Sequence, residues 1–180
     1  LAALAAKETN EDAVLMAIPA DHFIKDELNY VLAMRKAILN IQHQTIIMLG
    51  IKPTKPAEAF GYIEFSGNKT IKEIKSFTEK PSVKKAREML EKGCYAWNSG
   101  MFILKAQTWL EAIEQAHKVI YKTSQLAWNE KNTDQWFDRP SSQHFKLCPS
   151  VSIDYAVMEK GKTLHLDLKL INFNAGWTDL

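Results

Sequence analysis

Cysteine is scarce in this 180-residue sequence, and the two cysteines present do not have the spacing of a metal site. Cys94 and Cys148 lie far apart and form no C-x-x-C pattern, which argues against a zinc site and against a disulfide framework. A reduced, cytoplasmic compartment fits this usage best. We therefore expect both thiols to behave as small, partly buried apolar side chains.

Long hydrophobic runs are also missing. No apolar run approaches the roughly 20 residues needed to cross a bilayer, and residues 1–6 lack the basic leader and the length of a secretory signal. The 23 basic residues are interspersed with 21 acidic ones, so the net charge of +2 gives no preference for nucleic acid. The sequence predicts a soluble protein whose partners include neither a membrane nor a nucleic acid.

Familiar catalytic motifs are absent as well. The sequence has no Walker loop, no HExxH and no G-x-S-x-G, so ATPase, zinc protease and α/β-hydrolase chemistry have no support. With 46% hydrophobic and 24% charged residues, the chain has the composition of an ordinary globular domain. We expect one domain over residues 1–180.

What the sequence does contain is a strand, helix, strand pattern near its start. Residues 13–18 form a short apolar run typical of a strand buried on both faces, residues 27–41 carry a helical apolar stripe, and residues 45–51 form a second apolar run. This order favours parallel pairing with a right-handed crossover. Further strands are expected at 60–65, 70–78, 101–104 and 164–173, and helices at 1–7, 83–92, 106–128 and 153–158. The predicted class is α/β, with a mixed, mostly parallel sheet flanked by helices.

Polar residues that directly follow apolar strands are the candidates for a site, because ligands of open α/β sheets lie beyond the carboxyl ends of the strands. Asp21 follows the first apolar run, and Asp179 follows a bend at Gly176. Two aspartates from distant strand ends suit Mg²⁺, which binds few carboxylates and completes its octahedron with water and phosphate oxygens. Lys80, at another strand end, would add a point charge near a second anionic group.

Each of these residues has a plainer interpretation. An aspartate after a strand is more often a turn former or a helix cap than a metal ligand, and Glu79 with Lys80 could form a solvated turn. Asn98, next to Trp97, offers both a donor and an acceptor to sugar hydroxyls, with a loop-structuring role as the alternative. His22 is expected to be a hydrogen-bonded structural residue rather than a base.

Taken in order, several segments resemble bacterial mannose-1-phosphate guanylyltransferases. They are LMAIPADHFI at 15–24, GIKPTKPAEAFGYI at 50–63, FTEKP at 77–81, YAWNSGMF at 95–102, SIDYAVMEK at 152–160 and GWTD at 176–179. The resemblance covers essentially the whole chain. It implies a Rossmann-like nucleotidyltransferase fold with a small β-hairpin subregion that binds the sugar, and it implies that residues 1–180 are a catalytic domain incomplete at both ends.

The resemblance also implies a reaction. The phosphate of mannose 1-phosphate attacks the α-phosphorus of GTP, which yields GDP-mannose for polysaccharide biosynthesis and releases pyrophosphate. Asp21 and Asp179 would hold Mg²⁺, and Lys80 would meet the sugar phosphate. Substrate contacts are implied for Gly61, Tyr62, Glu79, Asn98 and Asp154, although Asp154 has a structural role at a helix start as its alternative.

The chain departs from the family pattern in two places. Glu-Ala-Phe at residues 58–60 stands where the family has Thr-Gly-Tyr, which removes a glycine and a phenol near Gly61. The glycine-rich GGxGxRLWP loop, whose backbone would bind the triphosphate, has no counterpart, so the chain alone is expected to be inactive. The alternatives are a relative that uses another base or hexose, and a non-catalytic sugar-phosphate-binding homologue. A homodimer is a candidate assembly.

Overall fold

The computed structural model describes residues 1–179 and divides into two compact units. Unit 1 comprises residues 1–15 and 105–166, and unit 2 comprises residues 16–104 and 167–179. Leu180, which the predicted domain included, lies outside the described residues. Unit 2 carries most of the sheet and every predicted site residue except Asp154.

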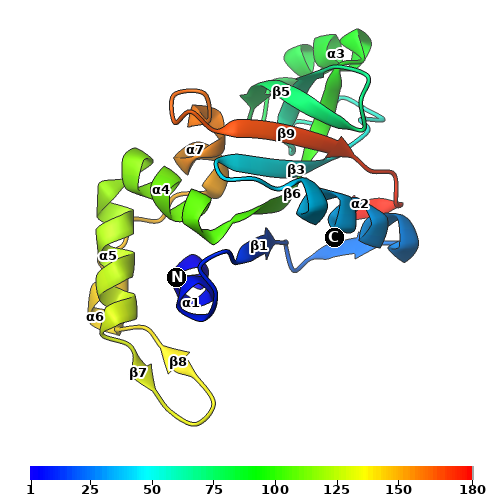
Figure 1. Ribbon diagram of the computed structural model, residues 1–180. Coiled ribbons are helices and arrows are strands. Elements are labelled where there is room, and N and C mark those ends of the chain that lie inside the picture. Colours follow the sequence, from blue (N-terminus) through cyan, green and yellow to red (C-terminus); the bar gives the residue numbers. More distant parts are fainter. Residues whose placement is uncertain (180) are drawn as a thin grey trace. The chain divides into compact units, whose positions relative to one another are not determined.

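The six-stranded sheet has the order β1-β6-β3-β9-β5-β4, and Figure 1 shows β3 between β6 and β9. Its strands are β1 Val14–Ala17, β3 Thr45–Ile51, β4 Tyr62–Ser66, β5 Ile71–Thr78, β6 Tyr95–Lys105 and β9 Asp167–Asn172. Two further strands, β2 His22–Ile24 and β10 Trp177–Asp179, form a ribbon of their own. The helices of unit 2 are α2 Glu27–Asn40 and α3 Val83–Lys92.

The α/β class and the mixed sheet are confirmed, but the proportion of parallel pairs differs from the prediction. β3 runs parallel to β9, whereas the pairs β3–β6, β4–β5, β4–β6 and β5–β9 are antiparallel. The expected direct pairing of the first two strands does not form, because β6 lies between β1 and β3. The strand–helix–strand order therefore predicted the three elements correctly, but it was wrong to predict that the two strands pair with each other.

Burial follows the position of each strand in the sheet. Residues 45–50 of β3 are all buried, and this central strand has a neighbouring strand on each edge, β6 and β9. β1 ends the strand order, and Met16 and Ile18 are 50% and 45% exposed. The predicted burial of this run on both faces is therefore wrong, because an edge position leaves apolar side chains open to solvent.

The β4–β5 hairpin and α3 form where the sequence predicts them. The hairpin turns at Gly67, whose φ of 91° is one that glycine adopts without strain. α3 begins after Ser82, whose Oγ accepts a hydrogen bond from the Lys85 amide, and it ends at Gly93 in the left-handed region with φ 67°. Local capping thus determines where this segment starts and stops.

Unit 1 is mainly helical. Its elements are α1 Ala2–Thr9, α4 Ala106–Ala116, α5 Lys118–Asn129, β7 Asn132–Thr133, β8 Asp138–Arg139, α6 Ser142–Phe145, α7 Ile153–Ala156 and the 3₁₀ turn η1 Met158–Lys160. The single helix predicted over 106–128 is broken at His117, whose backbone is not helical at φ −149° and ψ 74°. Among residues 1–179, no helix is both long enough and apolar enough to span a membrane.

Candidate functional site

The structure brings Asp21 and Asp179 together at the β2–β10 ribbon. Asp21 directly precedes β2, and antiparallel pairing places Asp179 opposite His22. One ligand atom from each of these three residues lies within 4.8 Å of the others. Both aspartates are exposed, so water and phosphate oxygens can reach a cation held between them.

Gly176 allows the chain to enter β10 in this register. Its φ is +62°, and a Cβ at this position would lie 2.8 Å from the Cβ of Lys25. Two backbone hydrogen bonds keep the segment before β10 next to the segment after β2. The Asp26 amide donates to the Ala175 carbonyl at 2.9 Å, and the Lys25 amide donates to the Gly176 carbonyl at 3.3 Å. A residue other than glycine would separate these segments and, with them, the two aspartates.

His22 is hydrogen-bonded, as the sequence predicts. Its side chain is only 8% exposed, and its Nδ1 accepts a hydrogen bond of 3.1 Å from Nε1 of Trp177. The two rings meet edge to face with centroids 5.2 Å apart. The other ring nitrogen, Nε2, faces Oδ1 of Asp179 at 3.8 Å.

Gly61, Glu79 and Asn98 also meet in space, although they come from three separate segments. A Cβ at Gly61 would overlap the Glu79 carboxylate and would lie 3.4 Å from the Cβ of Asn98. The backbone N–H of Asn98 donates a hydrogen bond to the Gly61 carbonyl at 2.8 Å. The predicted substrate contacts at these positions therefore share one region of unit 2, while their role in binding stays a prediction.

The segment of Asn98 lies within a strand rather than before one. β6 begins at Tyr95, because residues 95–97 pair with β4, whereas the sequence predicted a strand only from residue 101. Asn98 Oδ1 accepts from the Gly100 amide at 3.0 Å, and Gly100 has a φ of +71°. A Cβ at Gly100 would lie 3.1 Å from Pro19, so this bend fits against the segment that leads to Asp21.

Lys80 follows Glu79, the first residue after β5, and its side chain is exposed. Its φ of 43° lies in the left-handed region, which is costly for a residue with a Cβ. The buried Pro81 and the α3 cap at Ser82 follow at once and restrict the backbone on that side. Strain of this kind is frequent at functional sites, while the role of Lys80 in binding the sugar phosphate stays a prediction.

Two predicted substrate contacts are placed differently. Tyr62 is fully buried, and its hydroxyl accepts a hydrogen bond from the Ala57 amide at 2.9 Å, so it supports the loop before Gly61 and offers no surface to a ligand. Asp154 belongs to unit 1, in the first turn of α7, where a carboxylate stabilises the helix start. Ser152 caps the same helix by accepting a hydrogen bond from the Tyr155 backbone amide.

Sequence reasoning missed the part played by Phe60 and Trp177. The Phe60 ring lies 5.0 Å from the Trp97 ring and 5.5 Å from the Trp177 ring, centroid to centroid. Phe60 occupies the position where the family pattern has tyrosine, and here it packs between two indoles. The alternation of side chains along a strand would have placed Trp177 on the same face as Asp179, which is the one signal available without a structure.

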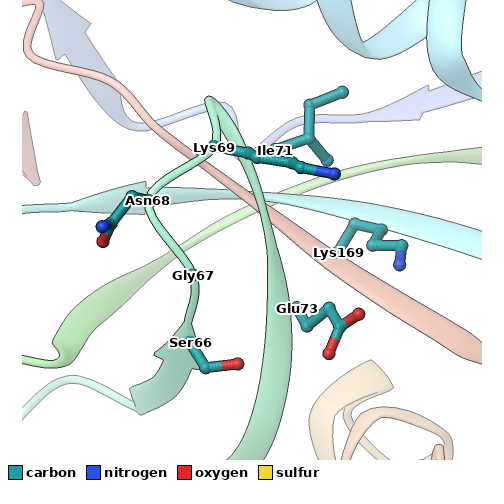
Figure 2. Close-up of a pocket in the computed structure, with 7 residues that line it drawn as sticks. All are labelled: Ser66, Gly67, Asn68, Lys69, Ile71, Glu73 and Lys169. Carbon is teal, nitrogen blue, oxygen red and sulfur yellow. The ribbon is translucent and has the colours of Figure 1, made fainter.

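A separate pocket of about 360 Å³ lies at the turn of the β4–β5 hairpin, the subregion expected to bind sugar. Figure 2 shows its lining residues, Ser66, Gly67, Asn68, Lys69, Ile71, Glu73 and Lys169. Glu73 and Lys169 are direct cross-strand partners, and a hydrogen bond from Lys75 followed by nearby lysine charges holds the pKa of Glu73 below its ordinary value. None of the predicted substrate contacts lines this pocket.

Comparison with known proteins gives consistent matches along the chain. The family model for nucleotidyl transferases matches residues 1–180. The xanthan biosynthesis protein XanB of Xanthomonas campestris pv. campestris (strain B100) is 36% identical over 180 residues, which cover 100% of this chain and 38% of XanB. The mannose-1-phosphate guanylyltransferase RfbM of Salmonella typhimurium is 37% identical over 174 residues, which cover 95% of this chain and 35% of RfbM.

A solved structure shows the same fold. The crystal structure of mannose-6-phosphate isomerase from Helicobacter pylori matches with a TM-score of 0.85 at 31% identity, over 98% of this chain and 69% of that one. The chain spans little more than a third of the length of the curated relatives cited, at 38% and 35%. The family match over the whole chain and the identities above 30% agree with the resemblance inferred from the motifs. The chain belongs to the nucleotidyl transferase family.

Proposed function

We propose that this chain carries the metal and sugar-phosphate part of an enzyme that transfers GMP from GTP to mannose 1-phosphate, forming GDP-mannose and pyrophosphate. The meeting of Asp21 and Asp179 from opposite ends of the sequence is the observation that supports it most. The relative named mannose-1-phosphate guanylyltransferase supports the choice of substrates. A cytoplasmic location and a homodimeric assembly stay predictions.

The residues at the β2–β10 ribbon suit Mg²⁺. Asp21 and Asp179 offer hard carboxylate oxygens, both exposed, at a mutual distance that one ion can bridge. When bound there, Mg²⁺ would neutralise negative charge on phosphate oxygens and help to align the attacking phosphate. The protein's own contribution is to hold the two carboxylates in place, through the Gly176 bend and the ribbon register.

The sugar phosphate would bind among Gly61, Glu79, Asn98 and Lys80. Glu79 and Asn98 offer groups that hydrogen-bond to hydroxyls, and the absence of a side chain at Gly61 lets the Glu79 carboxylate pack directly against the Gly61 backbone. Lys80 would attract the phosphate as a point charge on an exposed stem. These residues would orient the sugar-phosphate oxygen for in-line attack, with no covalent intermediate on the protein.

The decisive experiment compares carboxylate-to-amide variants in the natural polypeptide that contains this chain. We expect Asp21→Asn and Asp179→Asn each to lower Mg²⁺-dependent formation of GDP-mannose by about 100-fold or more, since a metal ligand is lost. Asp26→Asn is the matched control, because Asp26 caps α2 by accepting from the Asn29 amide and asparagine caps equally well.

Three outcomes would contradict this proposal. GDP-mannose formation at the parental rate in the Asp21→Asn, Asp179→Asn double variant would exclude the metal site. Turnover of another nucleotide or hexose 1-phosphate in preference to GTP and mannose 1-phosphate would identify a related transferase. Binding of mannose 1-phosphate without any turnover by the parental polypeptide would identify a non-catalytic homologue.

A further inference from the structure

The register of the β2–β10 ribbon places three side chains on one face. Asp179 pairs directly with His22, and Trp177 pairs with Ile24. Positions two apart along a strand share a face, so Trp177 and Asp179 lie on the same side as His22. Trp177 is thus the diagonal neighbour of His22, which explains how its indole reaches the imidazole.

The hydrogen bond from Trp177 determines where the proton of His22 lies. An indole N–H can only donate, so the Nδ1 that faces it at 3.1 Å must accept. A neutral imidazole with an accepting Nδ1 carries its hydrogen on Nε2. Nε2 lies 3.8 Å from Oδ1 of Asp179, beyond hydrogen-bond distance, so donation to Asp179 requires its 43% exposed carboxylate to move closer.

This tautomer has a consequence for the metal site. A nitrogen that carries a hydrogen has no lone pair for a cation, so His22 does not act as a ligand through Nε2 while Trp177 occupies Nδ1. We propose that His22, with its tautomer set by Trp177, is a positioning residue that donates a hydrogen bond to Asp179 and so directs the other carboxylate oxygen to the cation. This inference rests on the proposed function for the presence of a cation.

The surroundings keep the pair in place. The His22 side chain is 8% exposed, so its ring does not turn freely into solvent. Trp177 also packs against Phe60, whose ring centroid is 5.5 Å away, and Phe60 packs in turn against Trp97. Hydrogen bonds that orient metal-binding carboxylates commonly change metal affinity about 10- to 100-fold when removed.

The first test reads the tautomer without a metal. Long-range ¹H–¹⁵N correlation spectra of the natural polypeptide that contains this chain should show His22 with its hydrogen on Nε2. Trp177→Phe keeps an aromatic ring but removes the donor, so the spectra should show a mixture of both tautomers. A hydrogen on Nδ1 in the parental chain, or an unchanged spectrum in the variant, would overturn the inference.

The second test uses Mn²⁺ as the probe and follows its free signal by electron paramagnetic resonance. His22→Gln places an amide N–H near the position of Nε2, whereas the shorter side chain of His22→Asn reaches only the position of Nδ1. We expect the Mn²⁺ dissociation constant to rise about tenfold in His22→Asn and in Trp177→Phe, and to stay within about twofold in His22→Gln. Equal loss in the Gln and Asn variants would contradict a role for the Nε2 donor.

Trp128→Phe is the matched control for the indole substitution. Trp128 Nε1 donates to Oε1 of Glu8 at 2.7 Å, and both residues belong to unit 1, so the variant loses a comparable hydrogen bond that involves no residue of the ribbon. It should be less stable but should bind Mn²⁺ as the parental chain does. A parental chain that binds no Mn²⁺ would contradict the proposed metal site, and the tautomer spectra would then still decide the Trp177–His22 relationship.

Discussion

Gly61 and Glu79 are packed so closely that a single Cβ at Gly61 would overlap the Glu79 carboxylate. The same Cβ would lie 3.0 Å from Cζ of Phe77, a closer approach than most real Cβ contacts show. The backbone of Gly61 is fixed here as well, because its carbonyl accepts a hydrogen bond from the backbone N–H of Asn98 at 2.8 Å. The position therefore requires glycine for space rather than for its conformational freedom.

Gly61→Ala should weaken binding of mannose 1-phosphate about tenfold, which corresponds to about 1.4 kcal/mol, because the Glu79 carboxylate must move aside. Overpacking should also lower the free energy of unfolding by about 1–3 kcal/mol. Titration calorimetry and urea unfolding measure the two effects. In Gly93→Ala the new Cβ meets no atom of the described residues within 4 Å, so only the strain of φ +67° remains and binding should not change. Parental affinity in Gly61→Ala would contradict the placement of the sugar.

Lys80 offers a test of backbone strain against charge. Its φ of 43° should make Lys80→Gly about 1 kcal/mol more stable than Lys80→Ala, because only glycine adopts this conformation without cost. Both variants should bind mannose 1-phosphate more weakly than the parental chain, since both lose the ammonium group. Thermal unfolding gives the stability difference and calorimetry gives the affinity. Two variants of equal stability would show that the residue is not held in the left-handed region.

Ser99 and Asn98 are adjacent on β6 but should give opposite results. Ser99 is 2% exposed, and its Oγ donates to the Leu49 carbonyl at 2.7 Å. Ser99→Ala leaves that buried carbonyl with one partner fewer and should lower the free energy of unfolding by about 1–3 kcal/mol, with binding unchanged. Asn98→Ala should instead reduce the affinity for mannose 1-phosphate. Chemical unfolding and calorimetry on both proteins measure the contrast, and a reversed pattern would remove Asn98 from the site.

Asp12 provides a pH-dependent prediction in unit 1. A hydrogen bond of 2.9 Å from Lys105, followed by the charge of that lysine, lowers the pKa of Asp12. Because the folded pKa is depressed, the pair stabilises the fold above the ordinary pKa of aspartate, and this contribution is lost as the pH falls through the lowered value. The effect on stability is small at such an exposed site.

The measurement for Asp12 is an NMR titration of its side-chain carboxyl. Lys105→Gln should raise the pKa of Asp12 towards its ordinary value, because both the ammonium donor and its charge are removed. The pKa of Glu73 should not change, since its main partner is Lys75. An Asp12 pKa that is the same in the variant would show that the ion pair does not persist in solution.

Local signals predicted a large part of the fold. The start of α3 after Ser82, its end before Gly93 and the hairpin turn at Gly67 follow from capping and from left-handed backbone positions, which depend on a few neighbouring residues. The break at His117 was missed, because both α4 and α5 carry the same helical periodicity and the interruption is not visible in it. The buried hydroxyl of Tyr62 was missed for a similar reason, as burial depends on neighbours from distant segments.

The sequence by itself determined the α/β class, the family and the segments in which a site must lie, because motifs and periodicity are properties of adjacent residues. Only the tertiary structure decided that β6 lies between β1 and β3, that Asp21 faces Asp179, and that Trp177 reaches His22. Strand order and cross-strand register bring together residues that are far apart in the chain. No local pattern encodes those distances, because they arise from how the whole sheet packs.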